Sequence, residues 1–187
     1  MPKRFFDIAI VIVSLPIVLP LAAIVALAVL VTDGRPILYW SQRVGRHNRL
    51  FFMPKFRTMR RGTPAVATHL LTNPEAALTP IGRVLRSTSL DEIPQLVSVI
   101  RGDMSLVGPR PALFNQDDLI RLRTDHGIDG LVPGITGWAQ VNGRDDLSIP
   151  AKVEFEKEYL ERKSFGMDLK ILLMTAIKVL DRESVHH

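Results

Sequence analysis

The longest hydrophobic stretch of the chain lies close to its N-terminus. From Ile8 to Val31 no side chain is charged, and only Ser14 is clearly polar. A helix needs about 20 apolar residues to cross the hydrocarbon core of a bilayer, so the pattern predicts membrane insertion. A cleaved signal peptide is an alternative, with Ala26-Leu27-Ala28 as its small-residue site, but its apolar core would normally span only about 7–15 residues.

Two features of this stretch favour a re-entrant hairpin over a kinked spanning helix. Pro16 and Pro20 fall in its middle, where each removes a backbone hydrogen bond and bends a helix. Lys3 and Arg4 precede it, and further arginines follow it from Arg35 onward. Because lysine and arginine stay on the cytoplasmic side, two basic ends predict a segment that enters and leaves the membrane by the same face.

The pattern of the remaining chain predicts short strands first and helices later. Residues 37–40 and 50–53 are short aromatic and β-branched runs around a basic tip, which is typical of a hairpin. Residues 62–80 read as a loop with at most a short helix. Residues 149–165 have the spacing of an amphipathic helix, and residues 167–180 form an apolar segment too short to span, which suits a helix lying in the membrane interface.

Length and composition indicate one domain with an anionic partner. The 187 residues predict a single α+β domain, predominantly helical, with residues 1–34 as the re-entrant membrane helix and 35–187 as a cytoplasmic, membrane-associated catalytic domain. The absence of cysteine excludes disulfides, thiolate metal sites and thiol catalysis. The net charge of +5 suits a membrane surface, a phosphorylated substrate or nucleic acid. The apolar segment favours anionic lipid over nucleic acid as the partner.

The strongest candidate chemistry is the adjacent acid pair Asp91 and Glu92. Ser89 and Glu92 have the spacing of a capping box, although Pro94 would then remove a helical hydrogen bond; Asp91 as the N-cap is the alternative. In either register Asp91 lies at a helix N-terminus, which stabilises an anion. Such an aspartate could attack phosphorus or bind Mg²⁺, whereas simple capping of a helix is the structural alternative.

Several arginines near this pair could bind phosphate. Arg83 and Arg86 are one helical turn apart, which fits either a solvated basic face or a diphosphate clamp. Pro109 and Pro111 stiffen the loop that carries Arg110. The guanidinium fork matches phosphate oxygens, so Arg86 and Arg110 are candidate substrate-binding residues.

Six segments in order along the chain resemble those of the bacterial sugar transferases, the monotopic phosphoglycosyl transferases. The matching segments are Lys3-Arg4-Phe5-Phe6-Asp7, Gln42-Arg43-Val44-Gly45, Lys55-Phe56-Arg57-Thr58-Met59, Leu90-Asp91-Glu92-Ile93-Pro94-Gln95-Leu96, Gly102 to Pro111, and Pro133 to Arg144. Any one of them is modest support, but six together at family-like spacing are specific.

The resemblance implies an activity and a place in the cell. Such enzymes move a sugar-1-phosphate from a UDP-sugar to undecaprenyl (polyprenyl) phosphate with release of UMP and with Mg²⁺, at the cytoplasmic face of the bacterial inner membrane, and so begin glycoconjugate synthesis. By the same resemblance Asp91 is the nucleophile that forms a covalent phospho-sugar intermediate, and Glu92 is its partner. Asp91 is also the expected Mg²⁺ ligand, on the local chemistry given above. The alternative is an inactive membrane scaffold or lipid-binding protein of the same fold.

Beside this resemblance, the chemistry of the side chains points to further site and membrane residues. The expected substrate-binding residues are Arg86, Pro109, Arg110, Pro111 and Arg144, and the expected membrane residues are Lys3, Arg4 and Pro20. Residues 138–144 are expected to form a loop near the site. The family's serine before the helix-breaking proline is Leu19 here. The partners are the UDP-sugar, the polyprenyl phosphate and phospholipid, with no nucleic acid. The sugar, the role of Glu92 and the oligomeric state stay open, a homo-oligomer being one alternative.

Overall fold

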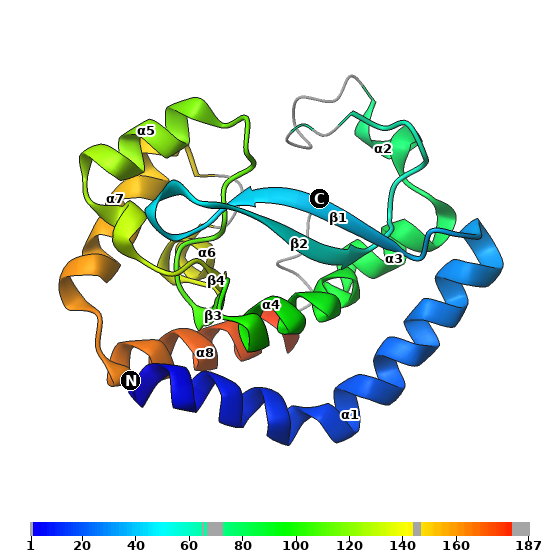
Figure 1. The fold of residues 1–187 in the computed structure, drawn as a ribbon, viewed down its shortest axis with the longest axis horizontal. Coiled ribbons are helices and arrows are strands. Elements are labelled where there is room, and N and C mark those ends of the chain that lie inside the picture. Colours follow the sequence, from blue (N-terminus) through cyan, green and yellow to red (C-terminus); the bar gives the residue numbers. More distant parts are fainter. Residues whose placement is uncertain (1, 65, 67–72, 144–146, 181–187) are drawn as a thin grey trace.

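The computed structural model describes residues 2–64, 66, 73–143 and 147–180, and this part of the chain is mostly helical (Figure 1). The N-terminal half contains α1 (Pro2–Asp33), β1 (Leu38–Val44), η1 (Arg46–Asn48), β2 (Leu50–Phe56), α2 (Pro74–Ala77), α3 (Pro80–Ser87) and η3 (Leu90–Gln95). The C-terminal half contains α4 (Leu96–Arg101), β3 (Ser105–Val107), α5 (Asp117–Asp125), η4 (Ile128–Gly130), β4 (Gly134–Thr136), α6 (Trp138–Asn142), α7 (Ile149–Arg162) and α8 (Phe165–Leu180). The expectation of a predominantly helical α+β fold is therefore confirmed.

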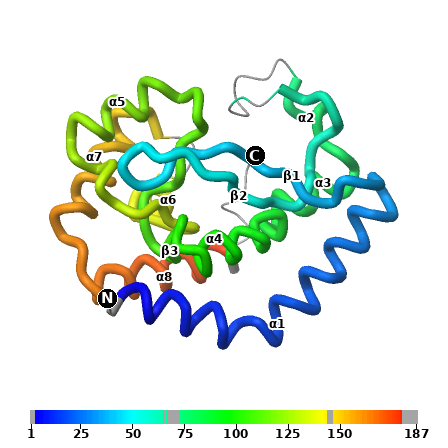
Figure 2. The backbone as a smooth tube through the Cα atoms, in the orientation of Figure 1, coloured from blue at the N-terminus to red at the C-terminus, as the bar shows by residue number. Residues whose placement is uncertain are grey.

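Helix α1 bends midway along its length (Figures 1 and 2). It contains Pro16 and Pro20, each of which interrupts the backbone hydrogen bonding of a helix. Its two ends reach the rest of the protein while its middle lies away from it. Val11, Val25 and Val29 are buried against the domain, whereas most other apolar side chains of the helix are at least partly exposed.

Polar contacts hold the N-terminal end of α1 on the domain. Lys3 Nζ lies 2.6 Å from Asp168 Oδ2 and donates to the Tyr159 hydroxyl at 2.9 Å. Arg4 Nη2 donates to the Ile100 carbonyl at 2.6 Å, near the C-terminal end of α4. Lys3 and Arg4, two of the three expected membrane residues, therefore bind protein groups. Tyr159 and Asp168 join this contact to α7 and α8.

A single arginine holds the opposite end of α1. Arg57 is buried just beyond β2, and its Nη2 donates to the carbonyl groups of Asp33 at 2.5 Å and Gly34 at 3.0 Å. Both ends of the bent helix are thus fastened to the same domain.

The predicted hairpin is confirmed. Strands β1 and β2 are antiparallel, with Ser41 opposite Met53 and Gln42 opposite Phe52. Ser41 and Met53 are buried, while Phe52 on the other face is 58% exposed, as the alternation of a strand requires. The buried face of β2 packs on η3 and so brings Lys55 to the acid pair.

A second, parallel pair of strands was not predicted. Strand β3 pairs with β4, with Ser105 opposite Gly134 and Val107 opposite Thr136. A Cβ atom on Gly134 would lie 2.1 Å from the backbone nitrogen of Gly108, so this approach requires glycine. The pairing of β3 with β4 therefore fixes the position at which the segment of residues 109–111 begins.

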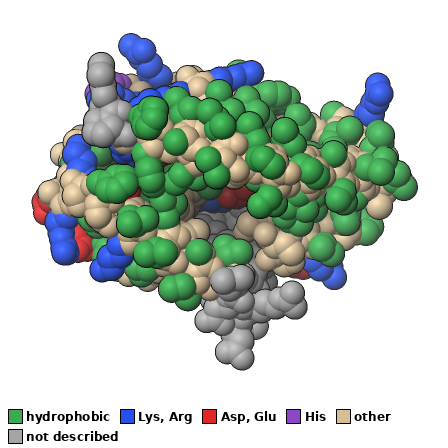
Figure 3. Space-filling view, turned by 90° about the horizontal axis from the view of Figure 1, so that it is seen from below, with side chains coloured by type: hydrophobic (Ala, Val, Ile, Leu, Met, Phe, Trp, Pro, Cys, Tyr) green, Lys and Arg blue, Asp and Glu red, His purple; other side chains and the backbone are tan. Residues whose placement is uncertain are grey.

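One face of the molecule is largely hydrophobic. Figure 3 shows this face from below, with apolar side chains spread across it and a hollow near its centre. Exposed apolar residues of the described chain include Ile17 of α1, Ile100 of α4, and Leu173 and Ile177 of α8. Among the described residues, α1 is the one helix long and apolar enough to cross a membrane.

Candidate functional site

The acid pair lies in the first turn of the 3-10 helix η3. Ser89 precedes this helix with a left-handed backbone conformation (φ 57°) and makes no side-chain capping bond. Pro94 fits inside the 3-10 turn. Ser89 therefore holds the N-cap position that the capping box predicts, but without its side-chain bonds, because Glu92 binds Lys55 and Arg110 instead. Asp91 lies at the N-terminus of the helix, as predicted, but within the first turn and not at the N-cap.

Glu92 binds two cations. Its Oε1 accepts hydrogen bonds from Lys55 Nζ at 2.7 Å and from Arg110 Nη2 at 2.8 Å. Burial alone would raise the pKa of Glu92, but Arg110 and Lys55 together hold it well below its usual range. Glu92 is therefore ionised at neutral pH and anchors two cations at the site.

Asp91 lies beside this ion pair and is buried. The residue is only 5% exposed, and its Oδ2 is 3.9 Å from Lys55 Nζ. Burial raises the pKa of Asp91 above its usual value, and Lys55 and Arg86 oppose this shift only in part. The sequence interpretation placed the stabilised anion at Asp91, whereas the cations hydrogen-bond to Glu92. The pKa of Asp91 is thus raised where the pKa of the neighbouring Glu92 is lowered.

Lys55 is a site residue that the sequence reasoning missed. Burial lowers the pKa of Lys55, an effect that Glu92 opposes. The residue reaches the acid pair because it lies on β2, paired with Tyr39 of β1, and β2 packs on η3. The motif that begins at Lys55 was the signal that could have found it.

Two of the predicted substrate-binding arginines line one large cavity with the acid pair. The cavity walls include Lys55, Arg86, Asp91, Glu92 and Arg110. Cationic groups around a buried carboxylate suit binding of a diphosphate and chemistry at phosphorus, because such chemistry requires charge neutralisation and positioning.

Pro109 and Pro111 are the buried neighbours that flank Arg110. Pro111 lines the same cavity, and the segment leads directly away from β3. The structure therefore brings this predicted motif to the acid pair.

Three other sequence interpretations have different outcomes. Arg83 is exposed and pairs with Glu75 at 2.9 Å, so its ion pair lies apart from the acid pair. Trp138 begins helix α6, so the expectation of a loop over residues 138–144 is wrong for its described part. Arg144 lies outside the described residues.

The residues present allow a Mg²⁺ site with few protein ligands. Within residues 2–64, 66, 73–143 and 147–180 no three or more His, Cys, Asp or Glu side chains gather to enclose a metal ion. Mg²⁺ commonly binds through one or two carboxylates, several waters and the phosphates of a substrate. The Glu92 oxygen Oε1 is occupied by two cations, so Asp91 is the carboxylate that fits this mode.

The site therefore combines the acid pair with the cationic side chains of Lys55, Arg86 and Arg110. The model of the family described as bacterial sugar transferase matches residues 1–182. The chain belongs to this family.

Relatives agree with this assignment. The chain is 40% identical to "Uncharacterized sugar transferase EpsL" of Bacillus subtilis, over 98% of the chain and 89% of the relative. It is also 40% identical to "Undecaprenyl-phosphate galactose phosphotransferase" of Salmonella typhimurium, over 98% of the chain and 41% of the relative. "UDP-glucose:undecaprenyl-phosphate glucose-1-phosphate transferase" of Xanthomonas campestris is 31% identical, with 98% and 40% covered. The chain thus spans most of one of these relatives and less than half of the other two.

Proposed function

We propose that the protein transfers a sugar-1-phosphate from a UDP-sugar to undecaprenyl phosphate and releases UMP. The observation that carries this proposal is the buried carboxyl of Asp91, which lies 3.9 Å from Lys55 in a cavity that also contains Arg86 and Arg110. The names of the Salmonella and Xanthomonas relatives supply the acceptor, and the Xanthomonas name supplies a UDP-sugar donor.

The reaction proceeds in two displacements at one phosphorus. An oxygen of Asp91 attacks the phosphorus that carries the sugar, the bond from that phosphorus to the bridging oxygen breaks, and UMP leaves with the electron pair. A phosphate oxygen of the lipid then attacks the same phosphorus, and the Asp91 carboxylate is released. Lys55, Arg86 and Arg110 neutralise the diphosphate and the charge that develops on the leaving UMP.

Glu92 acts as an anchor in this proposal and not as a base. The lipid acceptor is a phosphate monoester whose second pKa is near ~6, so most of it is already dianionic at neutral pH and loses no proton. Glu92 is ionised and bonded to two cations, and it thereby sets the positions of Lys55 and Arg110.

Asp91, together with oxygens of the donor diphosphate, would hold Mg²⁺. When bound, the ion would neutralise phosphate charge and favour departure of UMP. The fit rests on the carboxyl of Asp91, which lines the cavity beside the cation-bound Glu92.

The bent helix α1 is proposed to enter the cytoplasmic leaflet of the bacterial inner membrane and return. Both of its ends bind the same domain, through Lys3 and through Arg57, while its apolar middle points away. The exposed apolar side chains of α4 and α8 would lie in the interface, which would place the hollow of this face at the level of lipid headgroups (Figure 3).

A panel of UDP-sugars, assayed for UMP release with undecaprenyl phosphate and Mg²⁺, tests the activity. One or more donors should release UMP, and the Asp91→Asn variant should release none. With radiolabelled donor and no lipid, label should remain on the wild-type protein only. A wild-type protein that binds lipid but is inactive with every donor would instead identify the scaffold alternative.

A further inference from the structure

The segment from Pro109 to Ala112 is held by hydrogen bonds from outside itself. Its two prolines have no amide hydrogen, so the segment has few donors of its own. Each of its four carbonyl groups accepts a bond from elsewhere: that of Pro109 from Gly134 N at 2.9 Å, of Arg110 from Arg123 Nη2 at 2.9 Å, of Pro111 from Arg43 Nη1 at 3.1 Å, and of Ala112 from Val44 N at 2.9 Å. The position of Arg110 therefore depends on donors from several elements.

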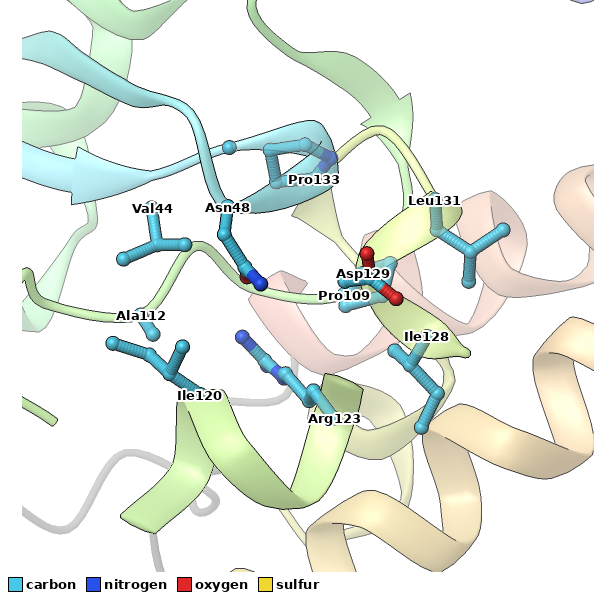
Figure 4. Close-up of a pocket in the computed structure, with 11 residues that line it drawn as sticks. Val44, Asn48, Pro109, Ala112, Ile120, Arg123, Ile128, Asp129, Leu131 and Pro133 are labelled. Carbon is cyan, nitrogen blue, oxygen red and sulfur yellow. The ribbon is translucent and has the colours of Figure 1, made fainter. Parts of the chain in front are cut away.

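Arg123 makes the bond to Arg110 itself. It lies on α5 and is almost buried, and its guanidinium forms two hydrogen bonds with Glu156 of α7: Nε to Oε2 at 2.7 Å and Nη2 to Oε1 at 2.5 Å. A planar guanidinium bound in this way has one orientation. Figure 4 shows Arg123 reaching from its helix toward the segment that carries Pro109 and Ala112, beside a small pocket.

We propose that Arg123, fixed by Glu156, is a positioning residue for Arg110. One end of Arg110 is then held at its backbone by Arg123, and the other end at its guanidinium by Glu92. This inference rests on the proposed function, in which Arg110 binds the donor diphosphate. In this inference α5, through Arg123, and α7, through Glu156, determine the position and orientation of Arg110.

A purely stabilising role does not explain the pair as well. Removing two charges from water offsets most of their attraction, so a buried ion pair is a weak stabiliser compared with apolar side chains of similar size. Glu156 is 2% exposed. The Arg123 guanidinium that it binds also donates a hydrogen bond to the carbonyl of Arg110 in the candidate site. Orientation of the Arg110 segment accounts for that bond.

The test is a double-mutant cycle with Arg123→Lys and Arg110→Ala. A lysine keeps the charge beside Glu156 but has no planar fork, so it cannot bind Glu156 through two nitrogens while also holding the Arg110 carbonyl. A displacement of about 1 Å at a reacting site can lower the rate roughly 100-fold. We expect Arg123→Lys to lower kcat/KM for the donor by roughly 10- to 100-fold, and Arg121→Lys, an exposed change on the same helix, to have no effect.

The cycle separates positioning from general damage. If Arg123 acts through Arg110, the Arg123→Lys change should have little further effect in the Arg110→Ala background. An equal loss in both backgrounds, in an active enzyme, would overturn the inference.

If wild-type protein is inactive with every donor, the proposed function fails, and the inference is then decided by hydrogen exchange of peptides covering residues 108–113. Faster exchange confined to that segment in Arg123→Lys supports it. Unchanged exchange, or faster exchange throughout the protein, overturns it.

Discussion

Lys55 Nζ lies 2.7 Å from Oε1 of Glu92, although the two residues are 37 positions apart in the sequence. Glu92 therefore accepts the hydrogen bonds of the cationic side chains. Asp91 lies next to them, but its Oδ2 is 3.9 Å from Lys55 Nζ, too far for a direct hydrogen bond. The two neighbouring carboxyl groups consequently differ in pKa, one lowered and one raised. Such a separation is the usual way in which adjacent acids acquire different roles.

Replacement of Lys55 tests the electrostatic part of this arrangement. Lys55→Met should lower kcat by roughly 10²- to 10³-fold, the usual effect of removing one charge-stabilising donor. Lys55 also lowers the pKa of Asp91, so its loss should move the acid limb of the pH–rate profile to higher pH. Lys163→Met, an exposed change, serves as the control. A rate loss without movement of the acid limb would contradict the coupling between Lys55 and Asp91.

Asp91→Asn should separate stability from activity. Because the pKa of Asp91 is raised in the folded protein, its ionisation opposes folding once the pH exceeds the pKa of the unfolded chain. The neutral amide avoids this effect, so at pH 7 the variant should unfold at the same temperature as wild-type protein or higher, while its activity is lost. Thermal unfolding in detergent and UMP release are the measurements. A clearly lower melting temperature would show that the carboxylate stabilises the fold.

Glu92 should have the opposite effect on stability. Its pKa is lowered on folding, so its contribution is present above its ordinary value of 4.5 and is lost as the pH falls below it. Glu92→Gln should therefore destabilise the protein most at neutral pH. The difference in unfolding free energy between the variant and wild type should shrink as the pH is lowered from 5. Urea unfolding over this range measures it, with Glu154→Gln as the exposed control. A difference that is independent of pH would mean that Glu92 is not held ionised by its neighbours.

The sequence was informative where local pattern decides structure. The hairpin follows from alternation, since Ser41 and Met53 face inward and Phe52 faces outward. Arg110 was expected at the site because its guanidinium matches phosphate oxygens and its two flanking prolines stiffen the loop, and the structure joins it to Glu92.

The remaining features depend on contacts between distant segments. Strands β3 and β4 have three residues each and pair through the close approach of Gly108 and Gly134, which no alternation reveals. The capping interpretation failed because Ser89 adopts a left-handed conformation and the following turn is a 3-10 helix. Lys55 was overlooked because its role arises only when β2 packs on η3.

Removal of Mg²⁺ should abolish turnover while leaving the fold intact. The proposed site uses a single carboxylate, Asp91, plus substrate phosphates, so the free protein should bind the ion weakly. EDTA should stop UMP release, excess Mg²⁺ should restore it, and the melting temperature without donor should change little. A large loss of stability with EDTA would indicate a structural metal site instead.

The path of α1 can be tested because the chain contains no cysteine. Single cysteines at Pro2 and Arg35 mark the two ends of the helix, and one at Ile17 marks its exposed apolar middle. With a membrane-impermeant maleimide, a re-entrant helix predicts that the two end positions are labelled in inverted inner-membrane vesicles and protected in intact spheroplasts. The Ile17→Cys variant should be unreactive in both, since hydrocarbon excludes the reagent. Labelling of Pro2→Cys and Arg35→Cys from opposite sides would require α1 to span the bilayer. The contacts of Lys3 with Asp168 and of Arg57 with Asp33 could not then both form, because they join the two ends of the helix to one domain.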